Sequence, residues 1–82
     1  MNQSIHFPDR EEWHETEQAI CFPALANGLN LTCAIHAATL QARFGEGEAM
    51  VLFRHHRWDL EEEAEARIRQ QQEDAQGWVW LS

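Results

Sequence analysis

The sequence predicts an α+β fold in which four antiparallel strands form a sheet and a long helix packs on one face. Three stretches carry this prediction: a hairpin signal at Asn27-Gly28, an apolar stripe in residues 46–72, and an alternating aromatic run in residues 78–82. A short helix is expected between the hairpin and the long helix, giving the order β-β-β-α-α-β. The expected architecture is a single α+β domain over residues 1–82.

The composition and net charge of the chain limit the kinds of function that we expect. The chain has 82 residues, 44% of them hydrophobic, and a net charge of −8 with six arginines and no lysine. Because polyanions bind through many Lys and Arg contacts, this acidic chain is not expected to bind nucleic acid through its surface charge. A solvated acidic surface is the main interpretation, and a nucleic-acid mimic or a partner for a basic protein is the alternative.

Hydropathy and the N-terminal sequence bear on localisation. No apolar run approaches the roughly 20 residues that a membrane span needs, so no membrane association is expected. The N-terminus lacks the basic and apolar segments of a signal peptide. We therefore expect a cytoplasmic protein.

The N-terminal part is expected to hold one short strand and a polar connection. Ile5-His6-Phe7 alternates apolar and polar residues before Pro8, which is typical of an edge strand. The segment that follows, through Glu17, is polar. Trp13 is its one large apolar residue, and we expect it to pack back onto the domain.

The hairpin predicts its own register. A two-residue turn at Asn27-Gly28 pairs apolar residues of Gln18–Ala26 with apolar residues of Leu29–Ile35 on one face. The predicted pairs are Ala26 with Leu29, Ala24 with Leu31, Phe22 with Cys33, and Ile20 with Ile35. This register puts Cys21 and Cys33 on opposite faces, which predicts two buried free thiols and no disulfide.

Two helices are expected after the hairpin. Residues 37–44 are rich in helix formers, and Gly45 is placed to end this short helix in a left-handed cap. In residues 46–72, Phe53, Leu60 and Ile68 belong to a stripe at helical spacing. We prefer one continuous helix there. The alternative is a second helix beginning after Trp58, with Asp59 and Glu62 as a capping box.

These elements match a known family pattern. The helix carries Phe53, Arg57, Leu60 and Ala64 at fixed spacing, and its most specific run is Arg57-Trp58-Asp59-Leu60-Glu61-Glu62-Glu63-Ala64. With the short first strand and the terminal aromatic strand, this resembles a small family of bacterial proteins described only as a domain of unknown function. The resemblance covers nearly the whole chain. It implies an α+β domain with an antiparallel sheet and a helix across it, and no activity.

No pattern of catalytic, cofactor-binding or metal-ligating residues stands out. His55 and His56 are adjacent on the expected helix, so their side chains point about 100° apart and do not converge on one ion. Cys21 and Cys33 lie within strands, where nothing lowers a thiol pKa. We therefore assign no catalytic, cofactor or metal residues and do not expect an enzyme, although a small enzyme is kept as an alternative.

The tryptophans indicate a candidate binding surface. Trp78 and Trp80 share one face of the last strand, and one long helix covers only one face of a sheet. If the alternate residues of that strand face the helix, the indoles lie on an open face with Cys21 and Thr32. If the indoles face the helix, they are core residues. Both arrangements are kept open.

Arg57 completes the candidate surface. It lies on the apolar stripe, where a charge needs a partner. A structural salt bridge and an anchor for a partner's carboxylate are both compatible with this position. The function expected is a non-enzymatic protein-binding or adaptor module whose partner is another protein or a second copy of the chain. A single-stranded nucleic-acid-binding or regulatory protein is the alternative, because sheet aromatics can stack on bases.

Overall fold

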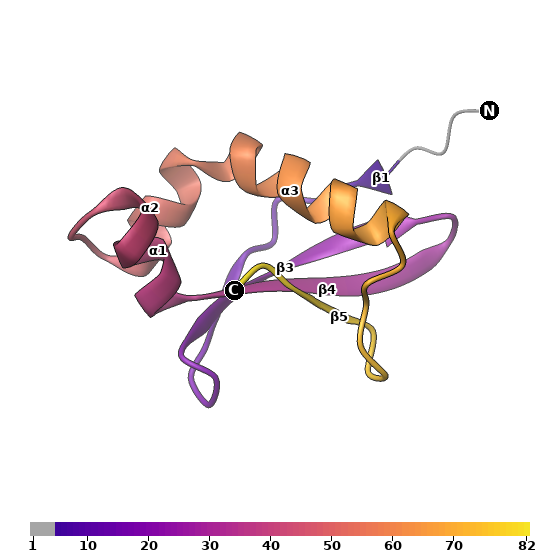
Figure 1. Cartoon of the computed structure of the whole chain (residues 1–82), viewed down its shortest axis with the longest axis horizontal. Helices are drawn as coiled ribbons and strands as arrows, with labels where there is room; N and C mark the ends of the chain where they lie inside the picture. Colours follow the sequence, from indigo (N-terminus) through magenta and orange to yellow (C-terminus); the bar gives the residue numbers. More distant parts are fainter. Residues whose placement is uncertain (1–4) are drawn as a thin grey trace.

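The computed structural model describes residues 5–82. It consists of one sheet with three helices on one side (Figure 1). The strand order is β1-β3-β4-β5, and β2 also pairs with β3. Residues 1–4, which the expected domain included, lie outside the described part. The elements are β1 Ile5–His6, β2 Glu12–His14, β3 Ala19–Ala26, β4 Leu29–His36, α1 Ala37–Phe44, α2 Ala49–His55, α3 Arg57–Arg69 and β5 Trp78–Trp80.

The hairpin of β3 and β4 has the predicted register. Asn27 and Gly28 both have positive φ angles, +53° and +80°, as a type I′ turn requires. All four predicted apolar pairs are present, including Phe22 with Cys33. The turn and the apolar alternation therefore determine the same alignment.

The burial and the free thiols of the two cysteines agree with the prediction made from this register. Cys21 and Cys33 are free and buried. Burial raises the pKa of Cys21 to about 11 and that of Cys33 to about 12. Both thiols are therefore protonated at neutral pH and are poor nucleophiles.

The expectation of a purely antiparallel sheet is wrong, because β5 runs parallel to β4. Trp78 pairs with Thr32 and Trp80 with Ala34. The three helices between these strands carry the chain back along one face, and such a crossover connects parallel strands. The sheet is therefore mixed.

A fifth strand lies inside the expected polar connection. Residues of β2 pair antiparallel with β3, and Trp13 is opposite Ile20. The segment Glu-Trp-His has only one large apolar residue, so its pairing with β3 is not visible as a pattern in the sequence. Trp13 is 40% exposed and lies beside α1 and α2 at the rim of an apolar hollow of about 440 Å³.

The prediction of one continuous long helix is also wrong. The chain leaves helical geometry at His56, with φ −115° and ψ 23°, so two helices cover residues 49–55 and 57–69. The second does not begin after Trp58 either, because Asp59 lies in its first turn. His56 stacks on Phe44 of α1, with ring centroids 3.7 Å apart. This tertiary contact accompanies the break, which no Gly or Pro marks.

The short helix α1 has the predicted bounds and ends at Gly45. The Gly45 N–H donates to the Gln41 carbonyl oxygen at 2.9 Å. The backbone at Gly45 has φ +99° and ψ −178°, a region open only to glycine and different from the left-handed cap expected.

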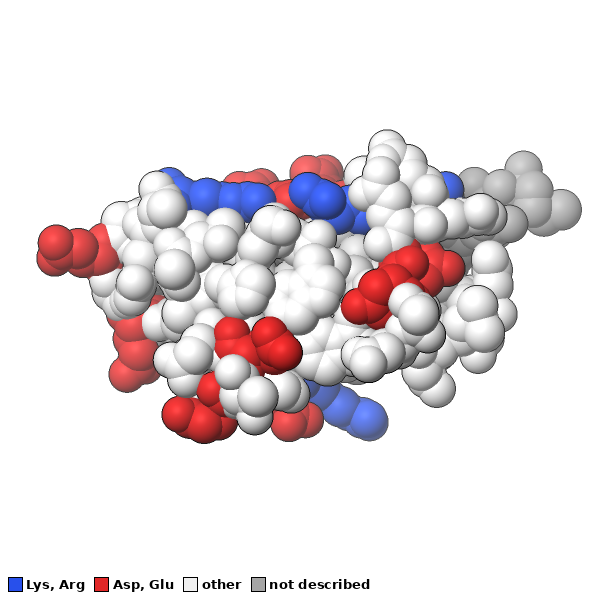
Figure 2. Space-filling view, turned by 60° about the horizontal axis from the view of Figure 1, so that its bottom comes forward, with Lys and Arg blue, Asp and Glu red and all other residues white. Residues whose placement is uncertain are grey.

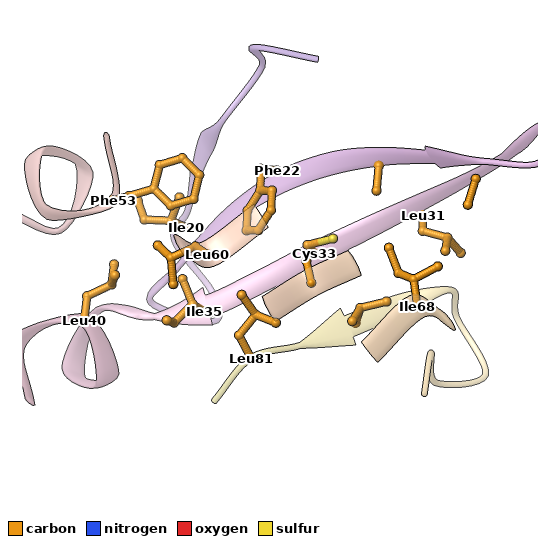
Figure 3. Close-up of a cluster of buried hydrophobic side chains, with 14 residues drawn as sticks. Ile20, Phe22, Leu31, Cys33, Ile35, Leu40, Phe53, Leu60, Ile68 and Leu81 are labelled. Carbon is orange, nitrogen blue, oxygen red and sulfur yellow. The ribbon is translucent and has the colours of Figure 1, made fainter. Parts of the chain in front are cut away.

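The core lies between the helices and one face of the sheet (Figure 3). Phe22 of β3 packs on Phe53 of α2, with ring centroids 4.9 Å apart. Leu60 and Ile68 of α3 extend the same cluster, so the predicted stripe keeps its phase across the break. The helix layer therefore covers one sheet face and leaves the other face without a helix (Figure 1).

Candidate binding surface

The last strand directs its tryptophans away from the helices. Val79 and Leu81 are 0% and 1% exposed and belong to the core beneath the helix layer. Trp78 and Trp80 alternate with them and are half-buried on the opposite face. Of the two arrangements left open by the sequence, the structure has the one with both indoles on the open face.

Two histidines extend the indoles into a row of four aromatic side chains. The Trp78 and Trp80 rings lie 5.4 Å apart between centroids. His14 meets Trp78 edge-on at 5.4 Å, and His36 stacks on Trp80 at 4.6 Å with an interplanar angle of 16°. We call these four residues the aromatic row.

Small side chains lie beside the two indoles on the neighbouring strands. Ala34 pairs with Trp80 on one side and with Cys21 on the other, and it is 0% exposed although no helix covers this face. Thr32, which pairs with Trp78, is half-buried. The predicted residues Trp78, Trp80, Thr32 and Cys21 therefore share one face, and Cys21 is mostly covered there.

A surface hollow of about 530 Å³ is lined by the aromatic row and two carboxylates. Glu17 and Asp74 supply these carboxylates, and Gln76 completes the lining. A second hollow of about 340 Å³ adjoins it, between Trp78 and Arg10. Figure 2 shows this side of the molecule as a largely uncharged surface with acidic side chains around it and basic side chains near its edges.

Hydrogen bonds fix the rim of the larger hollow. Asp74 Oδ1 accepts the backbone N–H groups of Gln76 at 2.8 Å and Trp78 at 2.9 Å. The Asp74 N–H donates to the Trp78 carbonyl oxygen at 2.8 Å. On the other side, the Glu17 N–H donates to His14 Nδ1 at 3.3 Å. The carboxylate of Asp74 and the ring of His14 are thus held in place before any ligand binds.

Arg57 is the one predicted surface residue that the structure does not bring to this face. It lies at the start of α3, in the helix layer, and donates a hydrogen bond to Glu11. Its Nη1 is 3.4 Å from Asp9 and 3.5 Å from Glu61, at ion-pair distance without hydrogen-bond geometry. The guanidinium also lies 5.1 Å from the centroid of the Phe53 ring.

Glu11 is the main partner of Arg57. Hydrogen bonds from Arg57 and Arg54 lower the pKa of the Glu11 carboxyl to about 2. The Glu11 side chain is only 10% exposed. The observed contacts of Arg57 are thus those of a structural salt bridge, the first of its two interpretations.

The model for proteins of unknown function designated DUF1488 matches residues 5–81, which is nearly the whole chain. The chain belongs to the DUF1488 family. Uncharacterized protein YrdB of Escherichia coli (strain K12) is 61% identical over 84 residues, with 99% of each chain covered. Its Shigella flexneri counterpart, also named YrdB, is 60% identical over the same coverage.

A solved DUF1488 structure has the same fold. The crystal structure of a family member from Shewanella loihica PV-4 superposes with a TM-score of 0.91 at 35% identity. The match covers 99% of this chain and 94% of that one. The predicted resemblance to a bacterial family of unknown function is confirmed, and the family description assigns no activity.

Five residues that line the larger hollow of this DUF1488 protein were not selected from sequence: His14, Glu17, His36, Asp74 and Gln76. His36 could have been found, because the correct hairpin register places it on the same face as Thr32. His14 could not, since the pairing of β2 was not predicted. Glu17 and Asp74 lie in turns, whose positions depend on the folded sheet.

Other features of this DUF1488 chain concern metals, membranes and a further tryptophan. Within residues 5–82, no three His, Cys, Asp or Glu side chains are grouped so that they could hold a metal ion. None of the helices in that range has the length and apolarity to cross a membrane.

Trp58 is 84% exposed on α3, away from the aromatic row.

Proposed function

We propose that this DUF1488 protein is a non-enzymatic protein-binding module that docks a partner on the aromatic row. One observation carries the proposal: four aromatic side chains are in contact on the sheet face that no helix covers. Aromatic side chains, tryptophan above all, are enriched among the residues that dominate the affinity of protein interfaces.

The packing of the row supports a preformed surface. Each indole contacts a neighbouring ring on both sides, and the small residue Ala34, which pairs with Trp80, is fully buried. Side chains held in this way lose little rotamer entropy when a partner binds. The partner is another protein or a second copy of this chain.

The same rings give some support to the alternative function, binding of single-stranded nucleic acid, because bases stack on aromatic side chains of a sheet. The charges around the row oppose it. Glu17 and Asp74 line the hollow beside the indoles, and a phosphate backbone would approach two carboxylates there. A protein partner fits this surface better.

An enzymatic role has less support from the geometry. Burial raises the pKa of both cysteine thiols, to about 11 and about 12, so neither is an activated nucleophile. The partly exposed pair of Arg57 and Glu11 joins the helix layer to the segment before β2 and does not line the two hollows of the open face.

A nuclease-treated pull-down from host lysate tests the proposal, with bound proteins identified by mass spectrometry. Trp80→Ser removes the centre of the row, and Trp58→Ser is the matched control because Trp58 is exposed on a helix. We expect a protein that wild type and Trp58→Ser enrich and that Trp80→Ser loses. Circular dichroism must show that both variants are folded.

Two further measurements separate the alternatives. Sedimentation of wild type and Trp80→Ser reports self-association, which the proposal includes. Titration with single-stranded oligonucleotides at low salt reports nucleic-acid binding through quenching of indole fluorescence. Saturable quenching by oligonucleotides, with no protein captured and a monomer in solution, would overturn the proposal.

A further inference from the structure

We propose that the larger hollow beside the aromatic row receives the guanidinium group of an arginine side chain on a partner protein. The inference rests on the proposed function, because it names the chemistry that a partner presents to the same face. It is carried by the combination of flat aromatic walls with two carboxylates at one hollow.

The aromatic walls suit a planar cation. Trp80 and His36 are close to parallel, at 16°, and Trp78 is tilted from Trp80 by 31°. The hollow of about 530 Å³ beside these rings is large enough for a long side chain. Guanidinium groups stack on indole faces, where the ring quadrupole attracts the positive charge.

The carboxylates supply hydrogen-bond acceptors at the rim. Asp74 Oδ1 is occupied by two backbone N–H groups, which orient the carboxylate and leave its second oxygen for a ligand. Glu17, on the turn that follows β2, also lines the hollow, and its backbone N–H donates to His14. A guanidinium has five N–H donors in a fixed plane, which matches such acceptors.

The described chain places no arginine or lysine at this hollow. Arg10 lines only the neighbouring hollow, and the sequence has no lysine. The other five arginines form ion pairs with glutamates in or beside the helix layer: Arg43, Arg54, Arg57, Arg67 and Arg69. With a net charge of −8, the whole molecule attracts a basic segment.

Arginine fits this hollow better than lysine. A lysine ammonium is a compact, strongly hydrated charge without a flat face. Packing against the aromatic row together with hydrogen bonding to Asp74 requires a cation that is planar and has several donors. Only the guanidinium side chain has both properties.

The first test is an NMR titration of the whole ¹⁵N-labelled protein with the peptide acetyl-Gly-Arg-Gly-amide. Peptides with lysine or with the uncharged isostere citrulline in place of arginine are the controls. We expect saturable shifts of the Trp78 and Trp80 indole N–H signals with the arginine peptide. Citrulline should bind about tenfold or more weakly. Equal binding of citrulline, or shifts confined to other residues, would overturn the inference.

Charge-removing variants provide the second test. Glu17→Gln with Asp74→Asn removes both carboxylates, and the Asn amide oxygen can still accept the two backbone N–H groups. Glu62→Gln with Glu73→Gln makes the same change in net charge outside the hollow. We expect roughly tenfold weaker arginine binding in the first pair and unchanged binding in the second. Equal weakening in both would indicate general attraction and overturn the inference.

The inference and the proposed function fail in different ways. If a partner is captured through Trp80 but the Glu17→Gln, Asp74→Asn protein captures it equally well, the module stands and the arginine site does not. If Trp80→Ser captures every protein that wild type captures, the proposed function itself is wrong, whatever the peptide titration shows.

Discussion

Arg57 and Glu11 are 46 positions apart in the chain and share a hydrogen bond between Nη2 of the arginine and Oε1 of the carboxylate. The other oxygen of Glu11 accepts a bond from Arg54 Nε at 2.8 Å. The Glu11 side chain is 10% exposed and the Arg57 side chain is 18% exposed, so water screens the charges of this pair only partly. This contact joins the segment before β2 to the helix layer.

The first prediction concerns the pH dependence of stability. The pKa of Glu11 falls from 4.5 to about 2 on folding, mainly because of the hydrogen bond from Arg57. The carboxylate therefore stabilises the fold fully above pH 4.5, and this contribution is lost progressively as the pH falls through about 2. Urea unfolding should show Glu11→Gln to be less stable than wild type at pH 6, and this difference should shrink steadily as the pH falls toward 2.

One neighbouring group acts in the opposite direction. Burial raises the pKa of Glu61 in the folded protein. Protonation of Glu61 therefore favours the folded state as the pH falls toward the pKa that Glu61 has in the unfolded chain. Burial, the largest cause, is the same in wild type and Glu11→Gln, and the charge of Glu11 is the smallest of the causes, so this effect largely cancels in their difference. A difference in unfolding free energy that stays constant between pH 6 and pH 2 would contradict the assignment to Glu11.

The second prediction concerns Arg57 itself. Arg57→Leu leaves the poorly exposed Glu11 carboxylate with Arg54 as its remaining partner, which should lower the free energy of unfolding by up to about 3 kcal/mol. Arg67→Leu breaks a surface pair with Glu63 at 3.3 Å and should cost less than about 1 kcal/mol. Chemical denaturation at neutral pH measures both. Equal losses would mean that Arg57 is no more than a surface charge.

The third prediction concerns thiol reactivity. Cys33 is 0% exposed and Cys21 is 9% exposed, and burial raises the pKa of both. Native protein at pH 8 should react slowly with iodoacetamide, with Cys21 modified before Cys33, and denaturant should expose both. Mass spectrometry of digested samples gives the order. Rapid labelling of Cys33 in the native protein would contradict its place in the core.

The fourth prediction concerns the hairpin turn. Gly28 has φ +80°, and a Cβ there would meet no atom within 4 Å, so the cost of Gly28→Ala is purely conformational. We expect a loss of about 1–2 kcal/mol in the free energy of unfolding. Asn27→Gly keeps the turn conformation and should change stability by less than about 0.5 kcal/mol. A neutral Gly28→Ala would show that the turn does not hold the register.

The fifth prediction compares a buried leucine of the last segment with an exposed leucine of β4. Leu81 is 1% exposed in the core, so Leu81→Ala should cost about 2–5 kcal/mol. Leu29 is 63% exposed at the start of β4, and Leu29→Ala should stay within about 0.5 kcal/mol. Thermal or urea unfolding compares the two. A mild effect of Leu81→Ala would argue that this segment does not close the core.

The hairpin and the short helix were predictable because their determinants are local. Asn27 and Gly28 accept positive φ angles, and the apolar alternation around them allows only one pairing that buries its apolar face. Part of the candidate surface followed from the same register, since it places Thr32 and Cys21 on the face opposite the core. The alternation in residues 78–81 then required only knowledge of which side the helices cover.

The remaining features depend on contacts between distant residues. The direction of β5 depends on the path of three helices across the sheet, and the pairing of β2 depends on a neighbour that sequence periodicity does not reveal. The break at His56 accompanies a stack on Phe44, although the apolar stripe reads as continuous. His14 joins the aromatic row only because β2 lies beside β3.

The sequence by itself determined the α+β class, the hairpin register, the buried thiols and the residues that the two faces of the sheet carry. Those properties follow from backbone preferences and from which side chains avoid water, and both act over a few residues. Only the tertiary structure decided that Arg57 pairs with Glu11 and that Trp80 stacks on His36. Such partners are chosen by the packing of whole elements, because a side chain can contact only what the completed fold brings within reach.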